Sequence, residues 1–142
     1  MWSKESIIYA AGIIDGEGSI SIEIQKREYG VRKVDYYAIR LVVINTNLEL
    51  MNWLLSSFGG ALGKRKSIVN RRQVYTWSIH SLNASNLLSE CYPYMIVKKS
   101  HAEAVIQFMN LKSKGTWFVT DEIQKERRDL YDKLKKINKH LI

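Results

Sequence analysis

Two acidic side chains, Asp15 and Glu17, follow an apolar segment of the sequence and are separated by a single glycine. If the segment is a helix, both carboxylates lie at its C-terminus, where the helix dipole disfavours negative charge. A bound divalent cation would resolve this conflict, because hard cations such as Mg²⁺ bind one or two carboxylates together with phosphate oxygens and water. The alternative is a buried helix that ends in a glycine cap beside a solvated acid. The spacing alone leaves both interpretations open.

The apolar segment predicts the helix that would carry these acids. At about 100° per residue, Ile8, Ala11, Gly12 and Asp15 form one stripe along it. Glycine costs a helix interior about 1 kcal/mol relative to alanine, so Gly12 suggests close packing against a second helix. The segment is too short to span a membrane, and it ends in acids rather than in the cleavage site of a signal peptide.

The stretch at residues 10–20, AAGIIDGEGSI, closely resembles the signature of the LAGLIDADG homing endonucleases. It has two small residues within the helix, then an acid, a small residue, a second acid and a closing glycine. Ala10 and Ile13 replace the usual leucines, and Glu17 replaces the more common aspartate while remaining an oxygen ligand. The resemblance implies that two such helices pack side by side at a two-fold axis, each bringing its last acid to metal ions at the scissile phosphates.

The resemblance also implies roles for particular residues. Glu17 and the backbone carbonyl of Gly16 would bind Mg²⁺; Mn²⁺ or Ca²⁺ could replace it in binding, but Ca²⁺ is not expected to support cleavage. Asn47 matches the polar residue of the family that orients the attacking water, and Lys98 matches the basic residue close to the active site. An N-terminal helix cap for Asn47 and a solvated helix-end cation for Lys98 are the alternatives. The homodimer interface would comprise Ile8, Ala11, Gly12 and Asp15.

The composition is that of an ordinary soluble globular protein with an excess of positive charge. The chain has 142 residues, a net charge of +8 and an isoelectric point near 9.6, which favours a polyanionic partner, either nucleic acid or an anionic membrane face. Its length indicates a single domain over residues 1–142, with a core at about 3–111 and a C-terminal helix at about 120–141. The single cysteine excludes an internal disulfide, and we expect an intracellular protein, in the cytoplasm, nucleoid or an organelle, that is neither secreted nor membrane-bound.

The rest of the chain alternates strand-pair and helix patterns. Alternation of polar and apolar residues after Gly18 predicts a strand, and a second strand is predicted to end at Asn45. Helices are expected at 48–58, 83–91 and 99–111, and a second strand pair at 61–68 and 73–80. This order predicts an α+β fold, αββαββα with an extra C-terminal helix, in which helices cover one face of a four-stranded antiparallel sheet. The resemblance implies that the other face forms a saddle for DNA.

Polar and basic side chains gather on the strands of the face expected to be uncovered. Arg, Lys, Gln and Ser contact base edges and phosphates, and strands can read the major groove. Any one-sided sheet exposes polar residues to water, but the basic loops at 26–33 and 64–72 favour nucleic acid. The predicted DNA-binding residues are Ser21, Glu23, Gln25, Arg27, Arg40, Lys64, Lys66, Arg71, Arg72, Thr76 and Ser78.

A single copy of the motif provides one acid at one helix end, whereas cutting both strands of a duplex needs two. We therefore expect a homodimer with a long, palindromic or nearly palindromic double-stranded DNA target. The resemblance implies a site-specific, intron-encoded homing endonuclease that makes a Mg²⁺-dependent double-strand cut. The alternatives are an RNA maturase that binds its own intron RNA and a DNA-binding regulator that keeps the fold but has lost cleavage.

Overall fold

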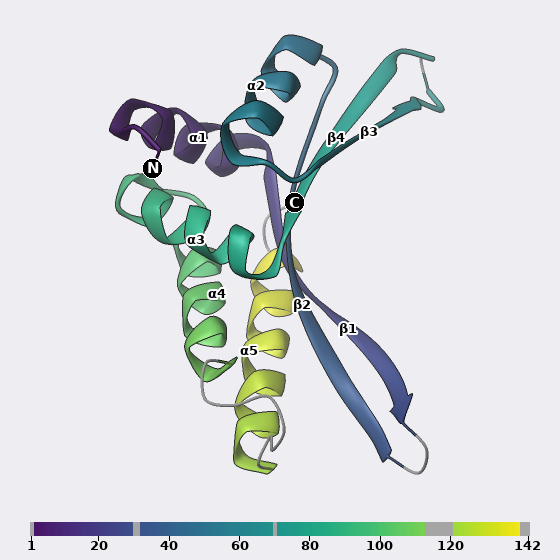
Figure 1. Cartoon of the computed structure of the whole chain (residues 1–142), viewed down its shortest axis with the longest axis vertical. Helices are drawn as coiled ribbons and strands as arrows, with labels where there is room; N and C mark the ends of the chain where they lie inside the picture. The colour runs from purple at the N-terminus through teal and green to yellow at the C-terminus, as the bar shows by residue number, and fades with distance from the viewer. Residues whose placement is uncertain (1, 30–31, 70, 113–120, 140–142) are drawn as a thin grey trace.

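The computed structural model describes residues 2–29, 32–69, 71–112 and 121–139 of the chain (Figure 1). Helices and strand pairs follow one another in the predicted order, and the α+β fold expected from the sequence is confirmed. The elements are α1 (Lys4–Glu17), β1 (Gly18–Tyr29), β2 (Arg32–Asn45), α2 (Leu48–Phe58), β3 (Ala61–Lys66), β4 (Gln73–His80), α3 (Ser81–Cys91), the short 3₁₀ helix η1 (Tyr92–Tyr94), α4 (Lys99–Lys112) and α5 (Asp121–Lys139).

The four strands form one antiparallel sheet in the order β1-β2-β4-β3. Figure 1 shows the helices on one side of this sheet, and the β1–β2 and β3–β4 hairpins extending toward opposite ends of the molecule. Because cross-strand partners share a face, the register decides which side chains point toward the helices. Leu41 lies opposite both Ile20 and Ile79, and all three are buried, which identifies the helix-covered face.

One hydrophobic core joins the α-helices to the covered face of the sheet. It contains buried side chains from α1 to α5 and from β1, β2 and β4, among them Trp77, Phe108 and Leu134. Trp77 also donates its indole N–H to the carbonyl of Gly59 at 2.8 Å, so its polar atom is satisfied although the side chain is fully buried. Burying each large apolar side chain stabilises the fold by about 1.5–3 kcal/mol, so this core holds the helices against the sheet.

α1 packs one apolar face against the core and exposes the other. Its buried residues are Ile7, Ala10, Ala11 and Ile14. Ile8 and Tyr9 are exposed, as is Gly12. Ala11, which the helical spacing placed on the predicted interface stripe, therefore belongs to the core of its own chain.

The helix passes into the first strand without a loop. α1 ends at Glu17, and β1 begins at the next residue, Gly18. A Cβ atom at residue 18 would lie 2.7 Å from the carbonyl oxygen and 2.9 Å from the Cα atom of Ile14, so a side chain does not fit there. This close approach places Glu17 at the junction between helix and sheet.

Three parts of the sequence prediction differ from the structure. The loop expected at 26–33 is mostly strand, because β1 continues to Tyr29 and β2 begins at Arg32. β3 ends at Lys66 rather than near residue 68, and α3 begins at Ser81 rather than near residue 83. The earlier start of α3 arises because β4 passes directly into α3 through Ser81, which has a φ of 53°. α5 ends at Lys139, and residues 140–142 lie outside the described part of the chain. None of the helices in the described ranges is long and apolar enough to cross a membrane.

Candidate active site

Glu17 is exposed at the C-terminal end of α1, where the helix meets β1. Its carboxylate oxygen Oε2 accepts a hydrogen bond from Nδ2 of Asn45 at 2.6 Å. Asn45 is the last residue of β2, so this bond joins the end of α1 to the neighbouring strand. The bond orients the carboxylate while the group stays accessible to solvent.

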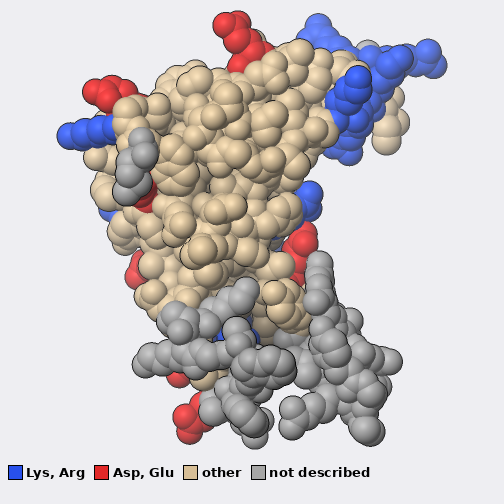
Figure 2. All heavy atoms as spheres, viewed as in Figure 1, with Lys and Arg blue, Asp and Glu red and all other residues tan. Residues whose placement is uncertain are grey.

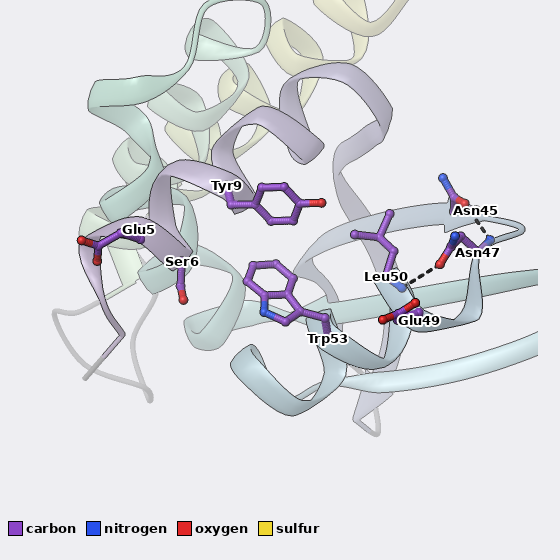
Figure 3. Close-up of a pocket in the computed structure, with 8 residues that line it drawn as sticks. All are labelled: Glu5, Ser6, Tyr9, Asn45, Asn47, Glu49, Leu50 and Trp53. Carbon is purple, nitrogen blue, oxygen red and sulfur yellow. Dashed lines mark hydrogen bonds between the residues drawn. The ribbon is translucent and has the colours of Figure 1, made fainter.

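Asn45 and Asn47 continue this hydrogen bonding toward α2 (Figure 3). Oδ1 of Asn45 accepts the backbone N–H of Asn47 at 2.7 Å. Oδ1 of Asn47 in turn accepts the backbone N–H of Leu50 at 2.9 Å, which is the N-terminal cap of α2 that the sequence offered as an alternative role for Asn47. It is therefore Asn45, rather than Asn47, whose side chain contacts Glu17.

Asn45 is a site residue that sequence reasoning missed. Alternation along β2 places it on the same face as Leu41 and Val43, which are fully buried. A polar side chain at the end of such an apolar series needs a hydrogen-bond partner, and the partner here is Glu17. The alternation of buried residues along β2, which ends in a polar residue, is thus the sequence pattern that could have identified Asn45.

An open pocket with a volume of about 790 Å³ lies between α1 and α2, beside the two asparagines (Figure 3). In it, the rings of Tyr9 and Trp53 meet edge to face with their centroids 5.0 Å apart. The pocket is lined by Glu5, Ser6, Tyr9, Asn45, Asn47, Glu49, Leu50 and Trp53. Because Asn45 and Asn47 line it, the amide that bonds Glu17 and the amide of Asn47 are both accessible from this side of the molecule.

Asp15, two residues before Glu17, is held by backbone groups of a distant segment. Its Oδ2 accepts the N–H groups of Ile96 at 2.6 Å and Val97 at 3.2 Å, and its Oδ1 accepts that of Lys98 at 2.9 Å. Burial acts to raise the pKa of Asp15, but these three N–H groups, with the nearby Lys98 ammonium, outweigh it and hold the pKa below its usual value of 3.8. Asp15 is therefore ionised at neutral pH and bound to the chain just before α4.

Lys98 reaches back to the same end of α1. Its side chain is buried, and its Nζ donates to the carbonyl oxygens of Ile14 at 3.1 Å and Asp15 at 2.7 Å. Desolvation by burial lowers the pKa of Lys98, and the neighbouring Asp15 carboxylate opposes this shift. Lys98 is thus not the solvated helix-end cation that the sequence allowed. The structure brings Asp15, Glu17 and Lys98 together at one helix end.

The uncovered face of the sheet carries most of the predicted DNA-binding residues of the strands. Cross-strand pairing places Ser21, Glu23, Arg40, Thr76 and Ser78 on it. Nη1 of Arg40 lies 3.3 Å from Oε1 of Glu23, with the side chains 39% and 43% exposed. An exposed ion pair of this kind contributes about 0–1 kcal/mol, so both groups are available to other partners at little cost. Gln25 and Arg27 belong to β1, but their side chains lie outside the described part of the structure.

Lys64 and Lys66 do not lie on that face, so their predicted placement on it is wrong. Along β3, both lysines point to the same face of the sheet as Leu62. The cross-strand partner of Leu62 is Trp77, which is buried beneath the helices. Arg65 occupies the position on the uncovered face instead. Every residue of β3 other than Leu62 is exposed, so no apolar alternation in the sequence marks the two faces of this strand.

Positive charge gathers on the β3–β4 hairpin (Figure 2). Arg71 and Arg72 are exposed in the segment between the strands, and Arg71 adopts a left-handed conformation with a φ of 54°. We call the basic residues of this region the hairpin cations: Lys64, Arg65, Lys66, Arg71 and Arg72. Such a concentration of cations attracts a polyanion to this end of the sheet.

A family model described as LAGLIDADG endonuclease matches residues 10–114, which is most of the chain. The chain belongs to this family. The matched range includes Asp15, Glu17, Asn45 and Lys98, so the whole bonded helix end lies within the LAGLIDADG region. No curated protein matches the chain in sequence.

Solved structures of homing endonucleases share the LAGLIDADG fold. I-CvuI, in complex with its target in the presence of Ca, aligns with a TM-score of 0.76 at 19% identity, over 94% of this chain and 82% of I-CvuI. An archaeal intron-encoded homing endonuclease complexed with DNA aligns with a TM-score of 0.74 at 20% identity, over 94% of this chain and 84% of its own. I-SmaMI bound to cleaved DNA aligns with a TM-score of 0.72 at 18% identity, over 92% of this chain and 44% of its own. These alignments confirm the expected fold.

The end of the LAGLIDADG helix offers the donor types that a hard divalent cation prefers. The carboxylate of Glu17 and the backbone carbonyl of Gly16 are neighbouring oxygen donors at an exposed point, and such cations take one or two carboxylates besides water and phosphate. Within the described ranges, no three His, Cys, Asp or Glu side chains are grouped so as to hold a metal by themselves. The residues present therefore fit a cation for which this chain supplies part of the ligand set.

Proposed function

We propose that this LAGLIDADG homing endonuclease cuts both strands of a long, nearly palindromic DNA duplex as a Mg²⁺-dependent homodimer. Membership of the family makes the chain a site-specific DNA endonuclease; the metal, the assembly and the residue roles are what we add. One observation carries the proposal: Glu17 is an exposed acid at the end of α1 that Asn45 holds in one orientation. An intron-encoded origin and an intracellular location beside DNA are part of the same proposal.

Glu17 and the carbonyl of Gly16 are the proposed metal ligands, with DNA phosphate oxygens and water completing the set. A bound Mg²⁺ supplies stabilisation of the charge that develops on the scissile phosphate and lowers the pKa of a coordinated water. Asn45 contributes by fixing the Glu17 carboxylate through the 2.6 Å hydrogen bond, so the ligand is oriented before DNA binds. Mn²⁺ and Ca²⁺ are expected to bind as well, with Ca²⁺ not supporting cleavage.

Asn47 is proposed to orient the attacking water, whereas the amide of Asn45 is bonded to Glu17 and to the N–H of Asn47. Because Oδ1 of Asn47 accepts the N–H of Leu50, the NH₂ group of Asn47 is the part that is left to contact water. Both amides line the open pocket between α1 and α2, so a water molecule can reach them. This pairing supports a polar site in which one asparagine orients the acid and the other orients the nucleophile.

The exposed face of α1 is the proposed two-fold interface. Ile8 and Tyr9 are 44% and 57% exposed, and a Cβ atom at Gly12 would meet nothing within 4 Å in its own chain. A helical glycine costs about 1 kcal/mol relative to alanine, and the close approach of a second α1 helix would account for it. Ala11 and Asp15 were also expected here, but the first is buried and the second is bonded within the chain. This chain aligns with 44% of I-SmaMI, so two copies of it would together be about as long as that endonuclease, which supports a dimer.

The proposed DNA-binding surface combines the uncovered sheet face with the hairpin cations. Ser21, Arg40 and Ser78 have the donor and acceptor groups needed to contact base edges, and the hairpin cations have the charge needed to contact phosphates. Arg65 joins the predicted residues because of its position on the uncovered face.

The experiment that tests the proposal is cleavage of a selected target. Randomised palindromic duplexes are bound in Ca²⁺, recovered and sequenced, and the selected duplex is then incubated with the protein in Mg²⁺. We expect a double-strand cut in Mg²⁺, none in Ca²⁺, and a rate that is about 10²–10³-fold lower for Glu17→Gln. Glu103→Gln removes an exposed acid of α4 and should cut normally.

Two results would contradict this function. Tight binding without cleavage in any metal would point to a maturase or a regulator. Cleavage that survives Glu17→Gln would place the active site elsewhere in the chain.

A further inference from the structure

Two oppositely charged residues, Asp15 and Lys98, are cross-bonded at the end of α1 although 83 residues separate them. Asp15 belongs to the last turn of α1 (Lys4–Glu17). Lys98 immediately precedes α4, and its carbonyl accepts the N–H of Ala102 at 3.1 Å, which begins that helix. Each residue therefore stands at the end of one helix while its side chain reaches the end of the other.

The carboxylate of Asp15 binds the start of α4. Three successive N–H groups, of residues 96, 97 and 98, donate to it over 2.6–3.2 Å. Successive backbone N–H groups form a concave anion site, and the N-terminus of a helix favours negative charge. The anion that α4 receives thus comes from α1.

The ammonium of Lys98 binds the end of α1. This helix has no basic residue in its last turn, although helix C-termini favour cations. Lys98 uses two of its three N–H groups on the carbonyls of Ile14 and Asp15, and only 8% of the residue is exposed. The cation that α1 lacks thus comes from the start of α4.

We propose that Asp15 and Lys98 form a reciprocal pair of helix caps, and that Lys98 positions Glu17 instead of contacting the scissile phosphate. The inference rests on the proposed nuclease function and gives Lys98 a different task from the one implied by resemblance to the family. Both the side chain and the carbonyl of Asp15 are held, and Glu17 follows two residues later in the same turn. The pair therefore fixes the backbone that carries the proposed metal ligand.

Amide hydrogen exchange at Gly18 tests the caps without DNA or metal. The Gly18 N–H donates to the carbonyl of Ile14, which is also an acceptor of Lys98. We expect Lys98→Met and Asp15→Asn each to speed exchange by about five- to tenfold, the loss typical of one helix cap, and the double variant to exchange no faster than the single ones. Lys99→Met removes the adjacent exposed lysine as a matched control and should exchange at the wild-type rate.

Cleavage of the selected duplex separates positioning from phosphate contact. We expect Lys98→Met and Asp15→Asn each to lower the single-turnover rate in Mg²⁺ by about ten- to a hundredfold, with DNA affinity in Ca²⁺ unchanged and the two losses not adding. A Lys98 that contacted the phosphate would give another pattern: Lys98→Met would slow cleavage with Gly18 exchange unchanged, and Asp15→Asn would cut normally. Either of these results, or additive losses, overturns the proposal.

The design keeps the two proposals apart. If wild-type protein cuts no selected duplex, the nuclease proposal fails while Gly18 exchange still decides the question of the helix caps. Circular dichroism establishes that each variant is folded. Asp15→Asn, which conserves the shape of the side chain, provides the answer if Lys98→Met unfolds.

Discussion

The C-terminal end of α1 and the β3–β4 hairpin are built in opposite ways, although both are proposed to meet the same DNA. At the end of α1, Glu17 is bonded to β2, Asp15 to three backbone N–H groups and Lys98 to two carbonyls. On the hairpin, the hairpin cations are exposed, and Ile68 and Val69 beside them are 98% and 94% exposed. One region is held by specific hydrogen bonds, and the other presents charge on long side chains.

The difference follows from what each task demands. Cleavage needs reacting groups in one geometry, because a displacement of about 1 Å can cost about 10²-fold in rate. Attraction between cations and phosphates declines gradually with distance, so an exposed arginine or lysine serves without a fixed position. Substitutions at the α1 end should therefore change the rate of cutting, and those on the hairpin should change affinity.

Asn45→Leu is the strongest test of the bonded region. Leucine has a similar volume but cannot donate the 2.6 Å hydrogen bond to Glu17. We expect the single-turnover rate on the selected duplex to fall by about 10²-fold, with affinity for DNA in Ca²⁺ little changed. Asn52→Leu makes the same exchange at an exposed position of α2 and should cut at the wild-type rate. Equal losses in the two variants would show that the contact with Glu17 is unimportant.

Asp15→Asn tests the same region through stability. Removing the ionised acceptor of three backbone N–H groups should lower the free energy of unfolding at pH 7 by about 1–3 kcal/mol. The pKa of Asp15 is lower in the folded chain than its usual 3.8, so its contribution is present above pH 3.8 and is lost as the pH falls through the folded value. Urea denaturation across this range should show the difference between wild type and variant shrinking in acid. A difference that is independent of pH would argue against an ionised Asp15 as the cap.

Arg65→Ala and Lys66→Ala compare the two faces of the hairpin. Arg65 lies on the uncovered face and Lys66 on the other. Loss of one phosphate contact reduces the slope of log affinity against log salt concentration by about 1, and we expect this for Arg65→Ala and a smaller change for Lys66→Ala. Fluorescence anisotropy at several salt concentrations measures both slopes. The reverse order would mean that DNA meets the hairpin from the helix side.

Gly12→Ala has the smallest expected effect. It tests the exposed face of α1, which belongs neither to the hydrogen-bonded helix end nor to the hairpin cations. Because the space beside Gly12 is open within the chain, alanine should stabilise the single protomer by up to about 1 kcal/mol through its helix propensity. The same methyl group should weaken the proposed dimer, which sedimentation equilibrium can measure. A dimer that is unaffected by Gly12→Ala, and also by the bulkier Gly12→Leu, would place the interface away from α1.

Local patterns in the sequence predicted most of the fold because helices and strands repeat at short range. The alternation after Gly18 marked β1, and the apolar spacing of residues 48–58 gave the bounds of α2 as the structure has them. β3 shows where such patterns fail. Almost all its residues are exposed, so burial leaves no alternation from which to assign Lys64 and Lys66 to a face.

The site was only partly predictable, because its contacts join residues that are distant in the chain. The motif itself identified Asp15 and Glu17. The bond between Glu17 and Asn45 spans 28 residues, and those between Asp15 and Lys98 span 83. A carboxylate that accepts backbone N–H groups can bond to residues of any type, so no pattern of residue types in the sequence predicts the contact. Lys98 could be expected near the site only from the family resemblance, which does not specify what its ammonium touches.

The direct passage from Glu17 to Gly18 has a mechanical consequence. With no loop between the helix and the strand, a twist imposed on β1 by a bound duplex should be transmitted directly to Glu17. A poorly matched DNA sequence that tilts β1 would then be bound but not cut. Discrimination between DNA sequences would arise in the cleavage step as well as in binding. For protein engineering, β1 would then both contact the DNA sequence and set the position of Glu17. Substituting side chains of β1 to recognise a new DNA sequence would therefore also change the position of the Glu17 carboxylate.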